Sequence, residues 1–196
     1  MKKCKIYFDR IIPRGSSTLV LTLLLLFALA VTAGSAGAEN FLINPEETPD
    51  EEFITYDEHP DYIVEAPATW MIDDQDLPRY IVFARRDPGS DFADNLNIIR
   101  EEGVQMSAQE YYEANLNLLQ EFMADFELIE EGESELDGHE AYEMIYHGQE
   151  NLKFHQLLTV FEGRGYVLTF TSTEEEFNDY RDILERMIDS FTFRED

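Results

Sequence analysis

The sequence predicts an α+β domain with a central, mainly antiparallel sheet and helices packed on its faces. Strand-like runs occur in two groups, and an amphipathic helix follows each group. Tight turns join the later strands, and turns of this kind connect antiparallel neighbours. The 196 residues are 44% hydrophobic and 13% aromatic, so the chain can build a core despite a net charge of -28.

Four short strand-like runs precede the first helix. They are residues 53–56, 62–66, 79–86 and 95–100. Turn residues separate them, as in His59-Pro60-Asp61. Trp70, the only tryptophan, follows the second run. Its large apolar ring favours a place in the core, and stacking on a ligand is the alternative.

Two helices are predicted, over residues 108–124 and 174–191, because apolar residues recur there at helical spacing. Each begins at a capping box, in which two side chains satisfy free backbone N–H groups: Ser107 with Glu110 and Thr173 with Glu176. Tyr111 and Phe122 lie off the apolar stripe of the first helix. They either widen its buried face or form a small interaction patch.

Four more strands are predicted between the helices. They are residues 127–136, 140–147, 152–161 and 166–172. Asp137-Gly138 predicts a two-residue hairpin turn, because glycine tolerates a positive φ. Residues 148–151 and 163–165 are expected to form the other two turns.

Residues 1–38 have the composition of a cleaved signal peptide. Five Lys and Arg residues precede an apolar run over residues 19–31, and small residues follow, which places the cut between Ala38 and Glu39. The run is too short for a comfortable membrane span, so no stable span is expected after cleavage. An uncleaved N-terminal anchor is the alternative. We therefore expect export to the periplasm or the extracellular space.

The rest of the chain divides into two parts. Residues 39–52 are rich in acids and Pro, which predicts a flexible linker. Residues 53–196 are expected to form a single domain. Cleavage after Ala38 would remove five cations and one acid, leaving 158 residues with nine cations, 41 acids and a net charge of -32. That charge excludes a nucleic-acid partner, which needs a basic face.

The sequence lacks the motifs of common catalytic and cofactor sites, so we expect no catalytic residue, cofactor or metal ligand set. It contains no G-x-S-x-G, P-loop or G-x-G-x-x-G motif. Its one cysteine, Cys4, lies in the expected signal peptide. His139-Glu140 begins an H-E-x-x-H pattern, but Glu143 stands at the second His position.

Two alternatives to a binding protein remain open. The abundant acids could bind calcium or another divalent cation weakly, although Asp74 and Asp76 begin a poor EF-hand loop with Pro78, Arg79 and Arg85 at later positions. A pair of carboxylates could also support a hydrolase. His147 and His155 flank the 148–151 turn, and an even four-residue loop would place their rings on opposite faces of the sheet.

Several segments, in this order, resemble the PsbP-like domains of the bacterial branch, which includes the DcrB-type proteins. They are Tyr62–Trp70 (YIVEAPATW), Asn95–Ile99, the S-x-x-E-Y helix start at Ser107, Asp137-Gly138, Gly165–Phe170 and Ser190-Phe191. The resemblance covers residues 53–193. It implies an α/β/α sandwich and a non-enzymatic accessory or binding role in the cell envelope, with a protein partner that the sequence does not name.

Overall fold

The computed structural model describes residues 52–85, 92–148 and 151–194. Its strands are β1 (Phe53–Tyr56), β2 (Tyr62–Pro67), β3 (Met71–Asp76), β4 (Tyr80–Ala84), β5 (Asn95–Glu102), β6 (Glu127–Leu136), β7 (His139–His147), β8 (Leu152–Phe161), β9 (Arg164–Thr173) and β10 (Thr192–Phe193). Its helices are α2 (Ala108–Phe122), the 3-10 turn η4 (Phe177–Tyr180) and α3 (Arg181–Asp189).

The strands form two antiparallel sheets. One has seven strands in the order β3-β4-β5-β9-β8-β7-β6, and the other has three in the order β1-β2-β10. Every pairing between the described strands is antiparallel. The predicted α+β class with a central antiparallel sheet is confirmed.

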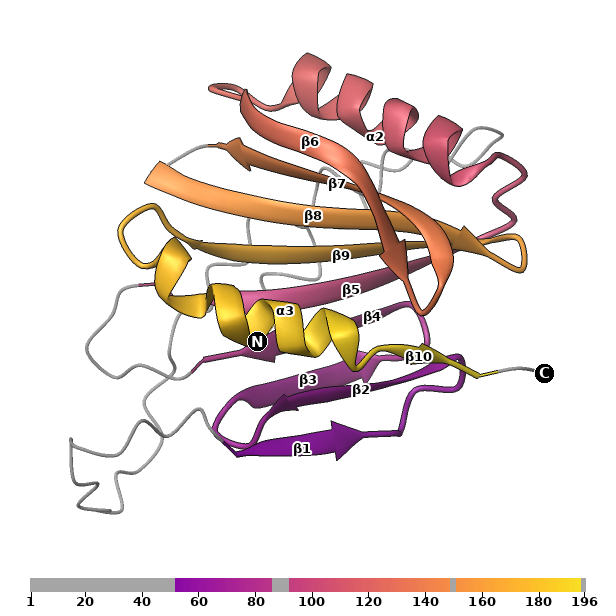
Figure 1. The fold of residues 1–196 in the computed structure, drawn as a ribbon, viewed down its shortest axis with the longest axis vertical. Coiled ribbons are helices and arrows are strands. Elements are labelled where there is room, and N and C mark those ends of the chain that lie inside the picture. The colour runs from indigo at the N-terminus through magenta and orange to yellow at the C-terminus, as the bar shows by residue number, and fades with distance from the viewer. Residues whose placement is uncertain (1–51, 86–91, 149–150, 195–196) are drawn as a thin grey trace, which may run out of the picture.

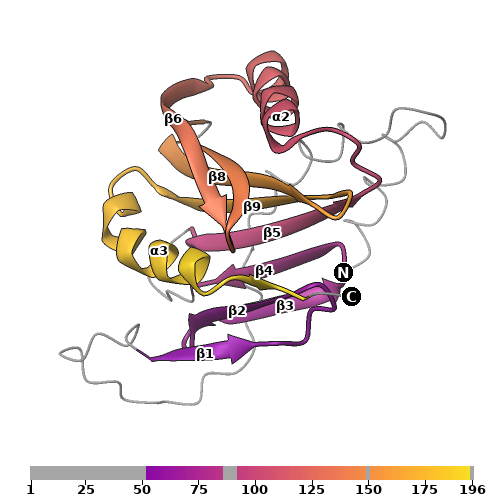
Figure 2. The same ribbon diagram turned by 45° about the vertical axis from the view of Figure 1, so that its right-hand side comes forward.

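The described elements form three layers around the seven-stranded sheet. Helix α2 packs over β7 and β8, while α3 packs against β2 on the opposite face (Figures 1 and 2). The expected α/β/α sandwich is thus refined: one outer layer is α2, and the other combines α3 with the three-stranded sheet. Each face of the large sheet packs against the apolar side of a covering element, so two hydrophobic cores form.

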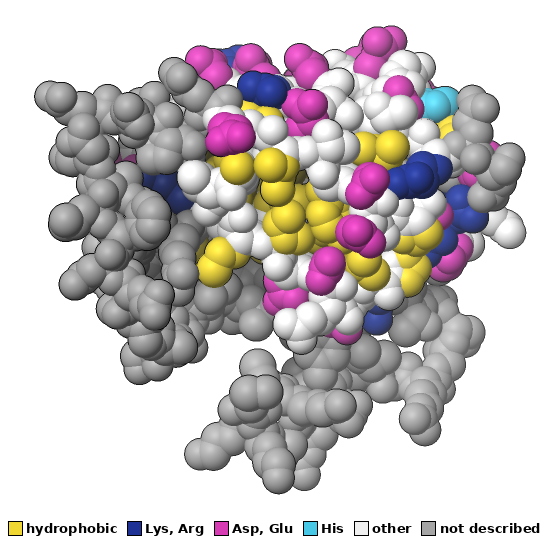
Figure 3. Space-filling model, turned by 90° about the horizontal axis from the view of Figure 1, so that it is seen from below, with side chains coloured by type: hydrophobic (Ala, Val, Ile, Leu, Met, Phe, Trp, Pro, Cys, Tyr) yellow, Lys and Arg dark blue, Asp and Glu magenta, His cyan; other side chains and the backbone are white. Residues whose placement is uncertain are grey.

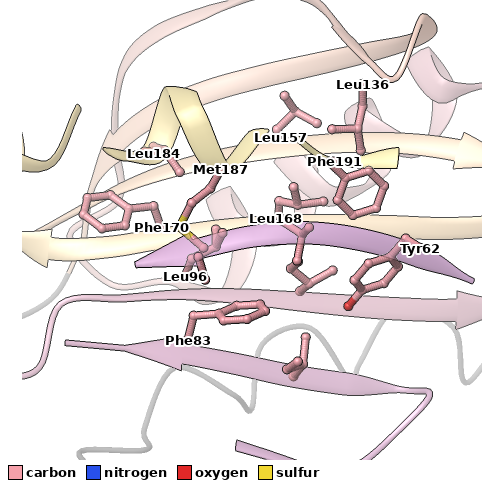
Figure 4. Close-up of a cluster of buried hydrophobic side chains, with 14 of the residues drawn as sticks. Tyr62, Phe83, Leu96, Leu136, Leu157, Leu168, Phe170, Leu184, Met187 and Phe191 are labelled. Atoms are coloured by element: carbon pink, nitrogen blue, oxygen red, sulfur yellow. The ribbon is translucent and has the colours of Figure 1, made fainter. Parts of the chain in front are cut away.

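The larger core lies between the two sheets and under α3. Its side chains come from elements throughout the described chain, among them Tyr62, Phe83, Leu96, Leu168, Phe170, Met187 and Phe191 (Figure 4). Tyr62 and Phe191 stack with ring centroids 4.7 Å apart. Trp70 is buried and meets Tyr180 edge-on at 6.3 Å. The expectation that Trp70 belongs to the core is confirmed.

The smaller core lies under α2. Tyr111, Tyr112 and Leu119 of the helix pack with residues of the sheet that include Met144 and Val167. Tyr111 is buried against Gly165 of β9, where an added Cβ would come within 2.6 Å of its ring. Tyr111 therefore widens the buried face of α2, one of its two predicted roles, whereas Phe122 is half exposed.

The predicted start of α2 is confirmed. Ser107 Oγ accepts from the N–H of Glu110 at 3.2 Å, and Glu110 Oε2 accepts from the N–H of Ser107 at 2.9 Å. The second predicted helix is shorter than residues 174–191. Thr173 Oγ1 accepts from the N–H of Glu176 at 3.3 Å, but Glu176 Oε2 accepts from the Thr173 hydroxyl and not from its N–H, so only half of the predicted capping box forms. The chain then passes through a turn and η4 before α3 begins at Arg181.

The structure adds a strand to the first group. β3 carries Asp at three of its six positions, 73, 74 and 76, and so lacks the alternation that reveals a strand. It is the edge of the seven-stranded sheet, where only one side needs a partner. The short tail at Phe193 also forms a strand, β10, which pairs with β2.

Two of the predicted turns can be checked in detail. Asp137 and Gly138 both have positive φ values, 50° and 75°, so the predicted two-residue hairpin turn is confirmed. The turn between β8 and β9 is instead formed by Glu162 and Gly163, with φ values of 50° and 72°. Gly165, expected in that turn, lies within β9.

The expected signal peptide (residues 1–38), its cut between Ala38 and Glu39, and most of the expected linker (39–52) lie outside the described residues. Within the described parts of the chain, no helix is long and apolar enough to cross a membrane.

Candidate functional site

The register of the β7–β8 hairpin differs from the prediction by one residue. His147 pairs with Lys153 and Ile145 pairs with His155. The two imidazoles therefore lie on the same face of the sheet, and the prediction of opposite faces was wrong. The cause is the connection, where Asn151 adopts a positive φ of 59° and five residues, not four, separate the paired positions.

Although His147 and His155 lie on the same face of the sheet, each contacts a different glutamate. His155 Nε2 lies 2.9 Å from Glu143 Oε2, and His147 Nε2 lies 3.8 Å from Glu174 Oε1. The contact with His155 lowers the pKa of Glu143. Among the described residues, no three His, Cys, Asp or Glu side chains are grouped so that they could hold a metal ion.

The two other sequence patterns that were considered as metal sites lie on strands. His139 lies on β7, and its ring contacts Phe161 and Phe193 at centroid distances of 4.5 and 5.5 Å. Asp74 and Asp76 lie on β3, not in a calcium-binding loop. Asp74 instead accepts a hydrogen bond from Tyr56 Oη at 3.1 Å.

A hydrolytic carboxylate pair would raise the pKa of one of its members through the charge of the other. Glu101 is the described carboxyl whose pKa is raised, and the cause is burial, opposed by a hydrogen bond from Tyr111 (2.9 Å) and by Arg79. No second carboxylate contributes to that shift. Glu101 lies under α2, and its hydrogen bond with Tyr111 is therefore a buried structural contact.

A network of charges ties the ends of several strands together. Asp61 forms ion pairs with Arg100 of β5 at 2.5 Å and with Arg164 of β9 at 3.8 Å. Arg100 also contacts Glu102 at 2.7 Å. Each of these arginines lies beside an acid of the network, which indicates a structural role.

His59 is buried beside this network. Its Nδ1 accepts from the N–H of Asp61 at 3.1 Å, and its Nε2 lies 2.8 Å from the carbonyl oxygen of Pro78. The ring must therefore be neutral with its proton on Nε2, since a carbonyl only accepts. It stacks on Tyr62 at 3.8 Å. Burial lowers the pKa of His59, which keeps this form neutral.

Exposed large hydrophobic side chains occur at two edge strands of the described chain, β1 and β3, as well as at Phe122 and Ile129. β1 and β3 are edge strands of the two sheets, and both lie at the lower end of the molecule (Figures 1 and 2). Ile54 and Met71 are each 42% exposed there. Ile72 and Leu77 are partly buried against the larger core. Figure 3 shows hydrophobic side chains gathered across this end.

Acidic side chains frame these apolar ones. Five exposed carboxylates follow β1 or lie on β3: Asp57, Glu58, Asp73, Asp74 and Asp76. We call Asp57, Glu58 and Asp74, with Ile54, Ile72 and Leu77, the β1/β3 seam. Met71 and Asp73 lie on the other face of β3, because they pair with Ala84 and Val82 while Ile72 pairs with Phe83 of the larger core. None of its carboxylates forms an ion pair with a cation in the described chain. Figure 3 shows acidic side chains between and beside the hydrophobic ones.

Sequence reasoning did not find the seam, because its two strands belong to different sheets and do not pair with each other. Ile54 is one apolar residue in a four-residue run, and Ile72 lies in a segment that reads as an acidic loop. The bond from Tyr56 to Asp74, which joins the two edges, has no local signal in the sequence.

The chain matches the family model described as PsbP-like protein over residues 36–193. No curated protein sequence is significantly similar to the chain.

Solved structures share the fold at low sequence identity. A Pseudomonas aeruginosa protein of unknown function, PA94, has a TM-score of 0.56 at 18% identity and covers 74% of this chain and 99% of its own. CyanoP, the PsbP of Synechocystis sp. PCC 6803, has a TM-score of 0.52 at 17% identity, over 83% and 99%. LpqN of Mycobacterium tuberculosis, involved in cell envelope biogenesis, has a TM-score of 0.54 at 11% identity, over 74% and 91%.

Proposed function

The chain belongs to the PsbP-like protein family, and from that premise we propose that it is an exported, non-catalytic accessory protein that acts by binding another protein. The observation that carries the proposal is the β1/β3 seam, where exposed apolar groups lie near acids that form no ion pair within the described chain, at edge strands of the two sheets. Exposed apolar groups that are framed by polar ones are typical of interaction sites.

Two further observations support a binding role. Two buried titratable groups of the described chain serve its internal contacts: Glu101 bonds with Tyr111, and His59 lies between Pro78 and Asp61. The seam differs because its carboxylates project from exposed positions without a cation. A surface of this kind can bind a partner protein without catalysing a reaction.

Export is supported by the order of basic, apolar and small residues in residues 1–38. LpqN, a protein of similar fold, is described as involved in cell envelope biogenesis. The test is mass spectrometry of the protein recovered from its native cells, outside the cytoplasm. We expect an N-terminus at Glu39, and a chain that keeps residues 1–38 would contradict cleavage.

Binding through the seam is tested by photo-crosslinking in the native cells. A photoreactive amino acid replaces Ile54 in one strain and Ile129 in another, because both side chains are about equally exposed, at 42% and 46%. Ile129 belongs to β6, at the opposite edge of the large sheet. We expect a discrete adduct from position 54 that position 129 does not give. The same adducts from both positions, or none, would contradict the proposal.

A further inference from the structure

We infer that residues 39–51 dock on the face of the seven-stranded sheet that α2 leaves open, with the uncharged run Asn40–Asn44 packed against it. This inference does not rest on the β1/β3 seam, because Ile72 of the seam packs against the larger core, on the opposite side of the sheet. The segment that the sequence predicts to be a linker would then complete the outer layer beside α2.

The pairing register defines this face. On β3, β4, β5 and β9, one set of side chains packs in the larger core: Ile72, Phe83, Leu96 and Phe170. The residues next to them in sequence point to the other side of the sheet, since side chains alternate along a strand. These residues form two rows across the four strands: Met71, Ala84, Asn95 and Thr171, then Asp73, Val82, Asn97 and Thr169. We call these two rows the open face.

No described helix or strand covers the β3, β4 and β5 part of the open face. α2 lies at the β6 end of the sheet and packs over β7 and β8 (Figures 1 and 2). α3 and the three-stranded sheet pack on the other side, around the larger core. Val82, Asn95 and Asn97 are accordingly only partly buried, whereas Ile81 and Leu96 of the same two strands are at most 1% exposed.

Exposed hydrophobic side chains stand at both borders of the open face. Met71, at the β3 border, is 42% exposed. At the other border, Tyr111 of α2 contacts Gly165 of β9. Phe122 follows Tyr111 by about three helical turns, so it lies on the same β9 side of α2, where it is 52% exposed. A segment that crosses the open face would remove both side chains from water, which is favourable.

The two rows between these borders offer hydrogen bonds and little charge. Neither the amide of Asn97 nor the hydroxyl of Thr171 is bonded to another described residue. An amide supplies both donors and an acceptor, so Asn97 can bond the C=O and the N–H groups of a peptide. Asp73 is the charged residue of the two rows, and it lies on the edge strand. The open face therefore suits an uncharged segment with apolar side chains.

Residues 39–51 join the described chain beside the β3 border. The carbonyl oxygen of Glu52 accepts a hydrogen bond from the N–H of Ala68 at 2.8 Å, and Ala68 precedes Met71 by three positions. The segment preceding Glu52 can extend over about 40 Å. Neighbouring strands are about 5 Å apart, so β3 to β9 spans about 15 Å. The segment is therefore long enough to reach every strand of the open face.

The composition of this segment matches the open face. Asn40–Asn44 has the sequence NFLIN, with three large apolar residues and no charge, in a chain that has 42 acids. The acids of the segment flank this run, at Glu39 and at positions 46, 47, 50 and 51. The last four are nearest the join with β1, so they can stay in water at the edge of the sheet while the run covers its face.

Two facts favour the chain's own segment over a separate molecule. The family model begins at residue 36, so the segment lies in the region that the family shares. The segment is also tethered, which gives it an effective concentration on the order of millimolar, so that weak contacts suffice. A second copy lacks this advantage, and the net charge of -28 on each chain would repel it.

The first test is a crosslink within one chain. A photoreactive analogue of phenylalanine replaces Phe41 in the full chain, expressed in its native cells, and mass spectrometry maps the adduct. We expect adducts to residues of the open face, such as Met71 and Val82. The absence of an adduct within the chain, or an adduct to Ile54 or Leu77 of the seam in its place, would overturn the inference.

The second test measures how often the segment leaves the face. Chymotrypsin cuts after Phe41 and Leu42 when the segment is free, so the rate of cutting follows the undocked population. Met71→Glu places a charge at the border of the open face. Ile129→Glu is its matched control, because both side chains are similarly exposed on edge strands, at 42% and 46%. We expect Met71→Glu to speed the cut about tenfold, with Ile129→Glu cut as slowly as the parent.

A second variant separates docking from local unfolding at β3. Asn97→Asp puts a charge in the middle of the open face with almost no change in size, and it should speed the same cut. Circular dichroism checks that each variant is folded. Equal rates of cutting in the parent and in all three variants would overturn the inference. Adducts from position 41 to a second copy or to another protein, in place of those within the chain, would overturn it as well.

Discussion

Gly165 shows how one missing side chain fixes the position of a helix. A Cβ at this residue would lie 2.6 Å from Tyr111 Cζ and 2.8 Å from its Oη. The tyrosine is buried and anchored by its bond to Glu101. It therefore has little room to move away, and the close contact of α2 with β9 depends on glycine.

We predict that Gly165→Ala destabilises the protein by about 1–3 kcal/mol, the usual cost of overpacking a core. The control is Gly132→Ala, because Gly132 lies in β6 with no atom within 4 Å of an added Cβ. The measurement is the urea dependence of unfolding for both variants. Equal stability of the two variants would contradict the role of Gly165.

His59 makes stability depend on pH. Burial lowers its folded-state pKa below 6.5, and the nearby Arg100 and Arg194 act in the same direction, while Pro78 and Asp61 oppose them. Below pH 6.5 the unfolded chain therefore binds a proton that the folded chain does not. The stability that the neutral ring contributes is complete above pH 6.5 and falls as the pH drops towards the folded pKa.

We predict that the melting temperature falls on acidification just below pH 6.5 and that His59→Gln reduces this slope. Glutamine keeps an amide donor for the Pro78 carbonyl but does not titrate. His139→Gln is the control, since His139 is half-buried against Phe161 and Phe193. If His139→Gln flattens the slope as much as His59→Gln does, His59 is not its source.

At the scale of elements, α2 depends on its N-terminal cap. Ser107 and Glu110 satisfy each other's backbone N–H groups, and no basic residue lies in the last turn to balance the helix dipole. We predict that Ser107→Ala lowers the free energy of unfolding by about 1 kcal/mol. Chemical denaturation measures the loss, and Ser107→Asp should retain most of the stability. A Ser107→Ala variant as stable as the parent would contradict the prediction.

The sequence predicted those elements that carry a local pattern. α2 has both a capping box and a helical stripe, and the Asp137-Gly138 turn has the one dipeptide that its φ values favour. β3 was missed because its pairing with β4 supplies the strand conformation while its side chains remain exposed. A residue pattern does not reveal a strand in which one side chain, here Ile72, is partly buried and the others are exposed.

The β7–β8 register and the seam were not predicted, for a related reason. One residue in a left-handed conformation, Asn151, moves every pairing of the hairpin by one position. The seam exists only because β1 and β3 end two different sheets that share one core. Both depend on how distant segments meet, which no window of the sequence contains.

At the scale of the whole molecule, the net charge of -28 opposes compactness. Like charges are concentrated in the edge strand β6, where five of ten residues are Glu. Glu135 is the direct cross-strand partner of Glu140. Like charges in this position destabilise a sheet. The fold tolerates them because its apolar residues lie in the two cores and the glutamates of β6 remain exposed to water.

We predict that the protein becomes more stable as NaCl rises from about 0.01 M to about 1 M, because the screening length falls from about 30 Å to about 3 Å. Calorimetry or circular dichroism gives the melting temperature at each concentration. A screening effect should be smaller in the variant Glu135→Gln with Glu140→Gln, which removes two of the repelling charges of β6 and β7. Salt-independent stability would show that the acids are too far apart to matter. An increase that is the same in parent and variant would instead assign the effect of salt to stronger apolar burial, which does not depend on those charges.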